Sequence, residues 1–479
     1  MLIAIIDDGI DRSKLLYHNL KYNLFVDDSN EIREWDSGNH IFTHHGTMCA
    51  RIIETYAPKA DFISISVFQN TKLKTNCERL FAALNWCLEN EIQLVHMSVG
   101  TDRLMDSLMI RPVIARMLMQ GQIIVAAGNN KGSYTIPACL GGVIGVIADK
   151  KLMGFTFKAC YSEKGILLSA SSRHKLTDLL GNISETDISN SYAAPTVTAA
   201  IHNILMNREP YSVSVPSLYR ELTEEKLENH LIRPDFIEDA YVLNLSGKRL
   251  LNHRFFFSCK EEITTFESLL NMDEYGKSFV FLPSMDVKEN KKVFDFMKNY
   301  QKQFKGILFA VRIERELLNG LEDILTWNEN NGDILRWNHS DENLKEHECP
   351  TIFITDDGEN GIDLACNLQK IFQEEGYQCI CISNQKYSYL YGLEYIPSKI
   401  LIDEAIQYVN FIYEPDLIIF CSRRQSINDV IMKDVNNYIV EFANDIERKE
   451  EKLNQSVMVY PYDKSDLENL YRHITVYFL

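Results

Sequence analysis

The sequence has no uninterrupted apolar run of about eighteen residues, so we do not expect a transmembrane helix. Glycine (22 residues) and proline (12 residues) are too scarce for a fibrous or low-complexity chain. Acidic residues (67) outnumber basic ones (49), and the net charge of −18 argues against a nucleic-acid binder because phosphates would be repelled. What remains is an ordinary globular chain of 479 residues, long enough for roughly two or three domains.

We expect no export signal at the start of the sequence either. The first residues, MLIAIIDDGID, contain neither a basic n-region nor a small-residue cleavage site. The 11 cysteines are an odd number without a pairing rhythm, and the C-x-C pair of Cys379 and Cys381 is weak support for a metal site. We therefore expect reduced thiols, a cytoplasmic protein, no membrane association, no metal and no cofactor.

Charge is distributed unevenly along the chain. Basic and acidic residues balance over residues 1–208, whereas residues 209–479 carry the whole net charge of −18. This asymmetry predicts a boundary near residue 208. We divide the chain into residues 1–208, an intermediate α/β region with a linker over 209–345, and an accessory α/β domain over 346–479. The acidic second part suits a basic partner, but a solvated surface that aids solubility is the favoured explanation.

The first 200 residues alternate strand-like and helix-like segments. The apolar, strand-like segments are Leu2–Ile6, Asp61–Phe68, Gln93–Val99, Gln122–Ala127 and Gly141–Ala148. The helix-like segments are Asn76–Asn90, Val113–Met119 and Tyr192–Leu205. Apolar strands that alternate with helices form a parallel sheet covered on both faces, so we predict an α/β, doubly wound fold.

The rest of the chain is less regular. Strands are expected at 279–282 and 307–311 with a helix between them over 287–303, and the polar stretch 327–348 is typical of a loop or linker. From Pro350 the α/β pattern returns. The expected strands are 351–355, 378–383 and 416–421, and the expected helices are 361–376 and 402–413.

Four segments carry residues suited to chemistry. Asp7 ends the first apolar strand, and His45 opens the segment HGTMCA. Asn129 follows a buried strand in IIVAAGNN, and Ser191 lies in SNSYAAP at the start of an apolar helix. Each residue alone is a weak signal, because strand-end aspartates and single histidines are common. Together, in the order Asp, His, Asn, Ser, they are specific.

This constellation resembles the subtilisin-like serine peptidases, the subtilase or S8 family. The resemblance covers roughly residues 1–205. LVHMSVG (94–100) is similar to the strand that forms one wall of the family's substrate cleft. YTIPA (134–138) and VIGVIA (143–148) are similar to the stretch after its oxyanion asparagine. The resemblance implies a serine endopeptidase with a subtilisin-like fold.

The resemblance also assigns roles. A serine hydroxyl is a poor nucleophile unless a neighbouring imidazole takes its proton, and His45 would do this for Ser191. Asp7 would hold the imidazole tautomer. The Asn129 amide and the Ser191 N–H would donate hydrogen bonds to the oxyanion. The next residue, Asn130, is expected to be a loop cap, because A-A-G-N fits the family at Asn129.

By the same resemblance, an extended substrate would lie between two edges of a specificity pocket. The substrate-binding residues expected along these edges are Ser98, Val99 and Gly100 on one side and Ala126, Ala127 and Gly128 on the other. The pattern does not identify the side chain that this pocket accepts.

Two catalytic positions have a neighbour that could replace them. Asp8 adjoins Asp7, but the family pattern D-[ST]-G places the catalytic acid first. His44 precedes His45, but only His45 is followed by the family's G-T. We therefore expect Asp7 and His45 to act.

The sequence departs from the family around the nucleophile. The usual G-T-S is Ser189-Asn190-Ser191 here, and serine in place of that glycine narrows the room for substrate backbone. Tyr192 is bulkier than the usual next residue, and Asp8 replaces the usual Ser or Thr. These changes suit a selective processing enzyme better than a degradative one. A decayed, non-catalytic peptide-binding protein is the alternative that they leave open.

The family's secreted members carry a signal peptide and a propeptide. Because the first apolar strand starts at Leu2, we expect neither in this chain. We also find no Asp-rich loop onto which a family calcium site can be carried over.

Residues 351–363, TIFITDDGENGID, occupy the place of a phosphate-binding loop between a strand and a helix. The loop's lysine position holds Ile362, and Asp356, Asp357 and Glu359 would repel a phosphate, so we expect an α/β domain without nucleotide. Residues 350–430 loosely resemble degenerate α/β proteins encoded beside peptide-maturation systems. The segments that carry this resemblance are TDDGENGIDLACNLQK, EEGYQC, YLYGLEYIP and YEPDLIIF.

That second resemblance implies a peptide or protein substrate, and specifically a ribosomally synthesised, post-translationally modified precursor peptide from which a leader is removed or whose core is cut. The acidic half would then recruit the precursor, or it would serve as a scaffold or dimerisation domain, which leaves a homo-oligomer possible. A general cytoplasmic subtilase is the remaining alternative. Selective processing and general degradation can be distinguished with unfolded casein, because only general degradation predicts that casein is cleaved.

Overall fold

The computed structural model describes residues 1–35, 43–68, 74–228, 231–250, 255–272, 276–329, 349–356, 360–423, 437–443, 457–461 and 467–478. The chain forms two compact units. Unit 1 comprises Met1–Ser246, Lys260–Phe309 and Ile313–Asn331, and unit 2 comprises Gly247–Cys259, Ala310–Arg312 and Gly332–Leu479. The three domains expected from the sequence remain a proposal. No helix within the described ranges is long and apolar enough to cross a membrane.

Unit 1 is built on a nine-stranded sheet with the order β3-β2-β4-β1-β5-β6-β7-β9-β8. Its strands are β1 (Leu2–Asp7), β2 (Leu20–Val26), β3 (Ile32–Glu34), β4 (Asp61–Ser66), β5 (Leu94–Met97), β6 (Ile123–Ala127), β7 (Ile144–Ala148), β8 (Phe157–Ala159) and β9 (Leu168–Ala170). All pairs from β2 to β9 in this order are parallel, and only the outer strands β3 and β8 are antiparallel. The carboxyl ends of the parallel strands therefore meet at one edge.

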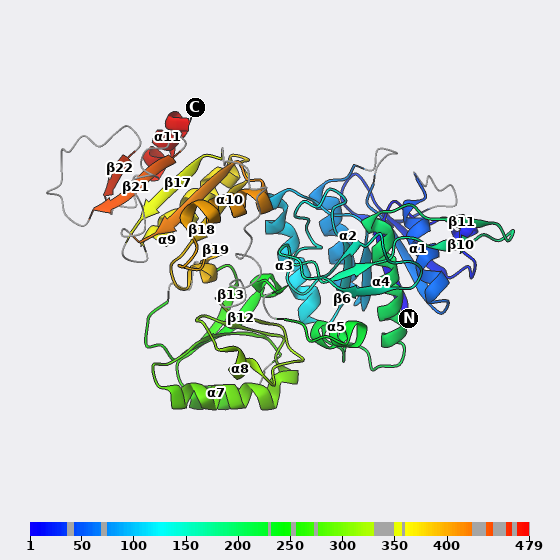
Figure 1. Ribbon diagram of the computed structural model, residues 1–479, viewed down its shortest axis with the longest axis horizontal. Coiled ribbons are helices and arrows are strands. Elements are labelled where there is room, and N and C mark those ends of the chain that lie inside the picture. Colours follow the sequence, from blue (N-terminus) through cyan, green and yellow to red (C-terminus); the bar gives the residue numbers. More distant parts are fainter. Residues whose placement is uncertain are drawn as a thin grey trace. The chain divides into compact units, whose positions relative to one another are not determined.

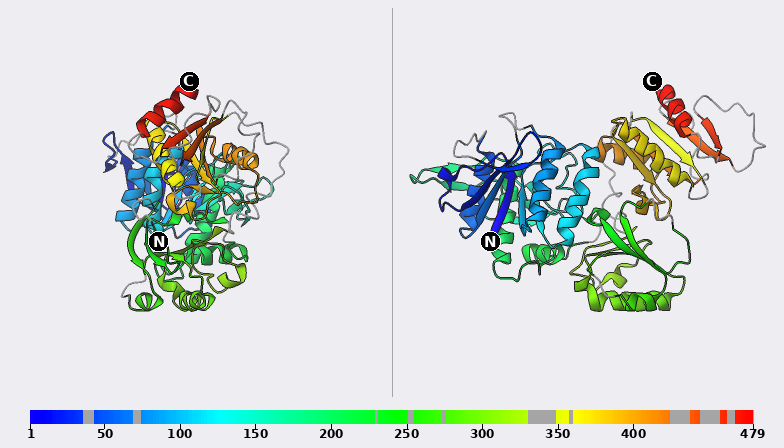
Figure 2. Two further views of the ribbon diagram at one scale, coloured as in Figure 1. Left: turned by 90° about the vertical axis from the view of Figure 1, so that its left-hand side faces the viewer. Right: turned by 180° about the vertical axis from the view of Figure 1, so that it is seen from behind.

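Helices cover both faces of this sheet (Figures 1 and 2). They are α1 (His45–Tyr56), α2 (Cys77–Glu89), α3 (Ser107–Met119) and α4 (Asn190–Leu205). Helix α1 packs against α4, and α2 packs against α3. The two helix pairs lie on opposite faces of the sheet, so every central strand is buried on both sides. The sequence of each central strand is therefore a continuous apolar run. The predicted doubly wound α/β fold is confirmed.

Strands β2 and β12 (Asp239–Asn244) are among those that the sequence did not predict. Strand β2 has exposed and buried positions because it lies near the sheet edge, so its apolar pattern is interrupted. Strand β12 begins and ends with polar residues. A short hairpin of β10 (Lys175–Thr177) and β11 (Ile183–Glu185) was missed for a related reason, because only Leu176 in it is buried.

The intermediate part of unit 1 carries a second sheet, with the order β13-β12-β14-β15-β16. Its further strands are β13 (Ser258–Ile263), β14 (Ser278–Leu282), β15 (Gly306–Phe309) and β16 (Thr326–Trp327), and its helices are α5 (Val215–Thr223), α6 (Phe266–Leu270), α7 (Val287–Tyr300) and α8 (Arg315–Leu318). Phe294 of α7 packs on Phe281 and Phe309 of the sheet. Trp327 ends a strand rather than starting the predicted loop, and the loop from residue 330 to 348 lies outside the described residues.

Unit 2 contains a six-stranded sheet with the order β19-β18-β20-β17-β21-β22. Its strands are β17 (Thr351–Thr355), β18 (Cys379–Ser383), β19 (Glu394–Tyr395), β20 (Leu417–Ser422), β21 (Asn437–Ala443) and β22 (Val457–Pro461), and its helices are α9 (Asn360–Glu374), α10 (Ile402–Tyr413) and α11 (Leu467–Phe478). All its strand pairs are parallel. The expected second α/β region is thus present.

The start of α9 is occupied by a carboxylate of the chain itself. Asp356 Oδ2 accepts a hydrogen bond from the Gly361 N–H at 2.7 Å. A Cβ on Gly361 would lie 2.8 Å from Asp356 Cβ, so the strand end and the helix start touch directly. Backbone N–H groups at a helix start are where a phosphate would bind. Asp357 and Glu359, which were also expected to repel a phosphate, lie outside the described residues.

Candidate active site

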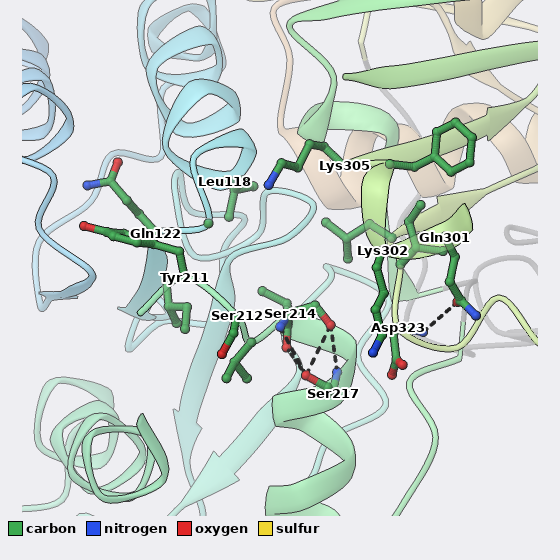
Figure 3. A pocket seen from close by; sticks show the side chains of 17 residues that line it. Leu118, Gln122, Tyr211, Ser212, Ser214, Ser217, Gln301, Lys302, Lys305 and Asp323 are labelled. Atoms are coloured by element: carbon green, nitrogen blue, oxygen red, sulfur yellow. Dashed lines mark hydrogen bonds between the residues drawn. The ribbon is translucent and has the colours of Figure 1, made fainter. Parts of the chain in front are cut away.

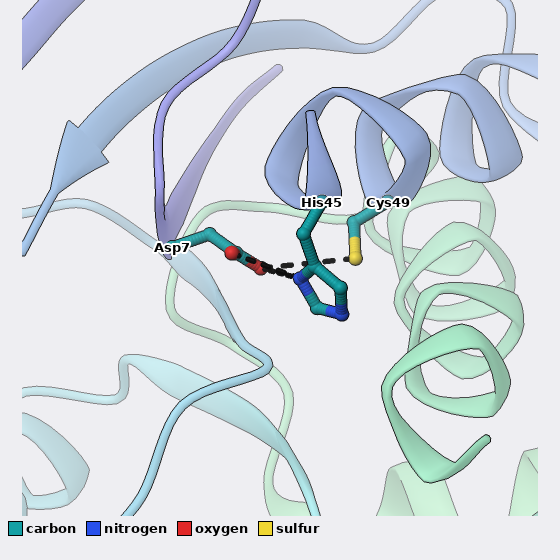
Figure 4. A group of neighbouring side chains, drawn as sticks. All are labelled: Asp7, His45 and Cys49. Carbon is teal, nitrogen blue, oxygen red and sulfur yellow. Dashed lines mark hydrogen bonds and ion pairs between the residues drawn. The ribbon is translucent and has the colours of Figure 1, made fainter. Parts of the chain in front are cut away.

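Asp7 and His45 form a hydrogen-bonded pair at the carboxyl edge of the large sheet (Figure 4). Asp7 is the last residue of β1, and His45 is the first residue of α1. The Nδ1–H of His45 donates to both carboxylate oxygens of Asp7, at 2.9 and 2.8 Å. A bond from Nδ1 to a carboxylate leaves Nε2 without a proton in the neutral imidazole. The pair therefore presents a base whose free nitrogen faces away from Asp7.

The electrostatics of this pair are set by burial and by two carboxylates. Burial raises the pKa of Asp7, partly offset by the charge and hydrogen bond of His45. Burial acts to lower the pKa of His45, but the charge and hydrogen bond of Asp7 and then the charge of Asp8 outweigh it, so the pKa of His45 is raised above 6.5. The imidazole is thus strengthened as a base.

Ser191 lies in the first turn of α4, directly after Asn190. Ser189 is the N-cap and accepts from the Tyr192 N–H. The backbone φ of Ser189 is −153°, an extended value that any residue adopts, so the lost family glycine causes no backbone strain here. The Ser191 hydroxyl makes no hydrogen bond to any described residue. A hydrogen bond to His45 requires the two side chains to come closer, and substrate binding often brings such groups together.

Asn190 connects the first turn of α4, which carries Ser191, to the large sheet through hydrogen bonds. Its buried side-chain amide donates to the carbonyl oxygens of Gly128 and Asn129, at 3.0 Å each, and its oxygen accepts from the Ala148 N–H at 2.8 Å. Three groups at the ends of β6 and β7 are thereby fixed relative to Ser191. In the sequence Asn190 stands out only as a departure from the family's G-T-S motif, and nothing local signals this role.

A series of hydrogen-bonded polar side chains connects the backbone of Ser191 to β5 and to α4. The Ser98 hydroxyl lies 3.2 Å from the Ser191 carbonyl oxygen and 3.0 Å from Nε2 of His96. Nδ1 of His96 lies 2.9 Å from the Thr198 hydroxyl of α4. Burial, followed by the charge of His45, lowers the pKa of His96 to about 3, so this histidine stays neutral. Ser98, expected at the cleft edge, thus also braces α4.

Cys49 lies one turn after His45 on α1 and faces the same pair (Figure 4). Donor atoms of Asp7, His45 and Cys49 lie within 4.8 Å of one another, the only such trio within the described ranges. Burial, followed by the charge of Asp7, raises the pKa of the Cys49 thiol well above its usual value. A protonated thiol is a poor metal ligand, so this cluster is better explained by the hydrogen bond that orients His45 on Asp7 than by metal binding.

One cavity of about 830 Å³ brings most of the expected site together. Asp7, His45 and Ser191 all line it. So do Ser98, Val99 and Gly100, the predicted first edge, and the remaining lining residues are Phe68, Lys74, Thr75, Asn76, Cys77, Glu78, Leu80, Thr101, Asp102, Arg103, Asp106 and Asn130. The cavity is therefore a groove that starts at the candidate triad and runs along α2 and the segment after β5.

Asn130, not Asn129, is among the residues that line this cavity. Asn130 Oδ1 accepts from the Asn190 N–H at 2.8 Å, which caps the start of α4. Asn129 Oδ1 accepts from the Lys131 N–H at 2.8 Å, which leaves its Nδ2 to donate elsewhere. Both asparagines adjoin the nucleophile turn, each uses its side-chain oxygen within the chain, and no described hydrogen bond engages the Nδ2 of either residue.

The predicted second edge lies at the end of β6. Ala126 and Ala127 are buried in the strand, and Gly128 follows with its N–H bonded to the Val146 carbonyl. None of these three residues lines the cavity. A Cβ on Gly128 would lie 3.0 Å from Ile147 Cγ2, so the backbone at this point is closely packed against β7.

A second cavity, of about 510 Å³, opens in unit 1 at the other end of β6 (Figure 3). It is lined by Ile123 at the start of β6, by the start of α5 and by the segments around Gln301 and Asp323. Lys302, Lys305 and Asp323 supply its charges. Ser214 and Ser217 cap α5 reciprocally, so their hydrogen bonds are used within the chain. This cavity holds none of the predicted site residues.

Residues 1–235 match the model of the subtilase family, peptidase S8. The minor extracellular protease Epr of Bacillus subtilis (strain 168) is 25% identical over 245 residues, which are 47% of this chain and 34% of that protein. The chain thus spans about a third of the length of this relative.

Three solved structures show similarity to parts of the chain. A cold-adapted subtilisin-like serine proteinase is 14% identical, covers 46% of this chain and 79% of its own, and has a TM-score of 0.34. The epidermin leader peptide processing serine protease EpiP of Staphylococcus aureus is 18% identical over 43% of this chain and 65% of its own, with a TM-score of 0.33. The prenylagaramide maturation protease PagA is 18% identical over 47% of this chain and 86% of its own, with a TM-score of 0.34.

Proposed function

Residues 1–235 belong to the subtilase family, and from this premise we propose that the chain is a serine endopeptidase in which Asp7, His45 and Ser191 form the triad. The observation that carries the proposal is the hydrogen bond from His45 Nδ1 to Asp7 at the rim of a groove that Ser191 shares. A base oriented by a buried carboxylate beside a serine at a helix start is the arrangement that acyl transfer requires.

In this mechanism the Ser191 oxygen attacks the scissile carbonyl while its proton passes to Nε2 of His45. The tetrahedral intermediate places its negative charge near the start of α4, where the Ser191 N–H lacks an intrahelical partner. The Nδ2 of Asn129 is the second donor. His45 then gives its proton to the leaving amine. Water attacks the acyl-enzyme by the same route, releases the acid and returns the hydroxyl of Ser191.

We propose that the substrate is a modified precursor peptide, from which a leader is removed or whose core is cut. One structural feature supports selectivity, because Tyr192 stacks on His45 and reduces the space beside the base. The second support is the resemblance of residues 350–430 to proteins of peptide-maturation systems. A cytoplasmic location is supported by the cysteines, all 11 of which are free.

The activity is tested by labelling with a fluorophosphonate. Wild type is expected to be labelled, whereas Ser191→Ala and His45→Ala are not. Circular dichroism shows whether each variant is folded. Absence of labelling in folded wild type would refute an autonomous peptidase and favour a non-catalytic peptide-binding protein.

The substrate class needs its own experiment. Wild type is incubated with unfolded casein and with a modified precursor peptide, and mass spectrometry finds the cut bonds. A single cut in the precursor with intact casein is expected. Rapid casein degradation would instead indicate a general protease.

A further inference from the structure

Helix α1 begins without a cap of its own. The N-cap position is held by His44, in the left-handed conformation (φ 59°, ψ 19°), and its side chain makes no capping hydrogen bond. The first N–H groups of an α-helix have no intrahelical partner, so the groups at the start of α1 need an acceptor from elsewhere. This start is also where His45 is mounted.

Asp8 supplies that acceptor from the end of β1. Its Oδ1 accepts from the Gly46 N–H at 2.7 Å. Its Oδ2 accepts from the N–H and the hydroxyl of Thr43, at 2.9 and 2.7 Å, and from the His45 N–H at 3.3 Å. The carboxylate is completely buried, and both of its oxygens are engaged within the chain.

We propose that Asp8 is the positioning residue of the catalytic base, holding the backbone of His45 against Asp7. The inference rests on the proposed function. It goes further than the family resemblance, which treated Asp8 only as a replacement for a serine or threonine.

Close packing makes the attachment direct. A Cβ on Gly46 would lie 2.7 Å from the Gly9 carbonyl oxygen and 3.0 Å from Asp7 Cβ, so the start of α1 rests on the turn that follows β1. The Asp8 N–H in turn donates to Asp7 Oδ1 at 2.8 Å. Two adjacent residues therefore hold His45, Asp7 by the imidazole and Asp8 by the backbone.

Asp8 also acts on the base through its charge. The titratable groups that face His45 are Asp7 and Asp8 at the end of β1, Cys49 on α1, His96 on β5 and Tyr192 on α4. Asp7 and Asp8 are the carboxylates of this set, and both favour the protonated imidazole. Removal of the Asp8 charge therefore lowers the pKa of His45.

A carboxylate here could instead bind a basic side chain of the substrate. Complete burial and saturated oxygens oppose that role, because such a contact would break hydrogen bonds to Thr43 and Gly46. The two roles also differ in kinetics. A substrate contact would change KM for one class of peptide, whereas a positioning role changes reaction with a small probe that has no peptide part.

The test compares wild type with Asp8→Asn and Asp8→Ser. Asparagine removes the charge and turns an N–H toward backbone N–H groups, whereas serine is the residue usual in the family. Asp11→Asn is the matched control, because the Asp11 side chain accepts only from Ser13. The readout is the rate of fluorophosphonate labelling as a function of pH.

Labelling needs neutral His45, so its rate rises with pH through the pKa of His45. In Asp8→Asn we expect this rise at lower pH and a plateau reduced roughly 10- to 100-fold, with Asp8→Ser in between. The control should match wild type. Wild-type rate and pH dependence in folded Asp8→Asn would overturn the inference.

Two measurements do not depend on enzymatic activity, so they separate this inference from the proposed function. NMR titration of the His45 imidazole in a Ser191→Ala background should show a lower pKa when Asp8→Asn is added. In the wild-type protein, amide hydrogen exchange at His45 and Gly46 should be slow. The second measurement applies even if the variants do not fold, and rapid exchange of both amides would overturn the inference.

Discussion

The ring of Tyr192 lies against the imidazole of His45, with ring centroids 5.4 Å apart and planes inclined by 27°. Because Tyr192 directly follows Ser191, the residue after the candidate nucleophile covers one face of the candidate base. This ring covers part of His45, whose side chain is 21% exposed, and loss of hydration is what opposes the effect of the two carboxylates on the imidazole.

Replacing Tyr192 by alanine is therefore expected to hydrate His45 and raise its pKa further. The rise of labelling rate with pH should move to higher pH, opposite to the shift expected for Asp8→Asn. Burial raises the pKa of the Tyr192 hydroxyl to about 12, so this group stays neutral at assay pH and Tyr192→Phe should behave as wild type. Identical pH profiles for the alanine variant and wild type would show that the ring does not shield the base.

The two neighbouring asparagines should separate catalysis from stability. Asn129→Ala is expected to lower turnover roughly 10²- to 10³-fold, because it removes an oxyanion donor. Asn130→Ala should lower the melting temperature more than turnover, because it uncaps α4 at Asn190. Labelling rates and thermal unfolding of both variants check this. A larger loss of rate in the Asn130 variant would exchange the two roles.

Asn190 is expected to contribute both to stability and to rate. Asn190→Ala leaves two carbonyls and the Ala148 N–H without their partner, so we expect a loss of about 2–4 kcal/mol in the free energy of unfolding. Urea unfolding measures this. The exposed Asn203 on the same helix donates to the Tyr56 carbonyl, and Asn203→Ala should cost less than about 1 kcal/mol. Equal losses would contradict the assigned role.

Activity and stability should depend on pH in opposite directions. His45 must be neutral to act as a base, so labelling rises as pH increases through its raised pKa, above 6.5. A raised pKa in the folded state contributes stability below pH 6.5, and that contribution is lost as pH rises through the folded-state value. The pKa of Asp7 is also raised in the folded state, so its contribution to stability is likewise lost as pH rises above 3.8.

We therefore expect the melting temperature to fall over the pH range in which the labelling rate rises. His45→Ala supplies the control, because it removes the labelling reaction and the histidine part of the stability trend. A melting temperature of wild type that increases with pH through this range would contradict the expected signs.

Much of the fold and the position of the site follow from local sequence. Buried parallel strands such as β1 and β6 are continuous apolar runs, and Asp7, His45 and Ser191 lie at the ends of such runs or at helix starts. The carboxyl edge of a parallel sheet then gathers them. The roles assigned to Asp7, His45 and Ser191 rest on the resemblance to the subtilase family, whose motifs are short runs of adjacent residues.

The supports of the site could not be predicted in this way. Asp8 reaches Gly46, His96 reaches Thr198, and Asn190 reaches Ala148, each across a long stretch of chain. Each contact depends on the packing of two elements, and a single polar residue in a strand or helix does not indicate its distant partner. Strand β2 was missed for a different reason, since its exposed positions interrupt the apolar run.

Strand β6 has the candidate catalytic groove beyond its carboxyl end and the second cavity at its start. The exposed amines of Lys302 and Lys305 border that second cavity. A fluorophore or a surface tether attached there would sit on the far side of the sheet from the entering peptide. A tether or an optical reporter at these lysines would leave the candidate groove unobstructed, so the cleavage proposed for that groove could be followed in real time on an immobilised molecule.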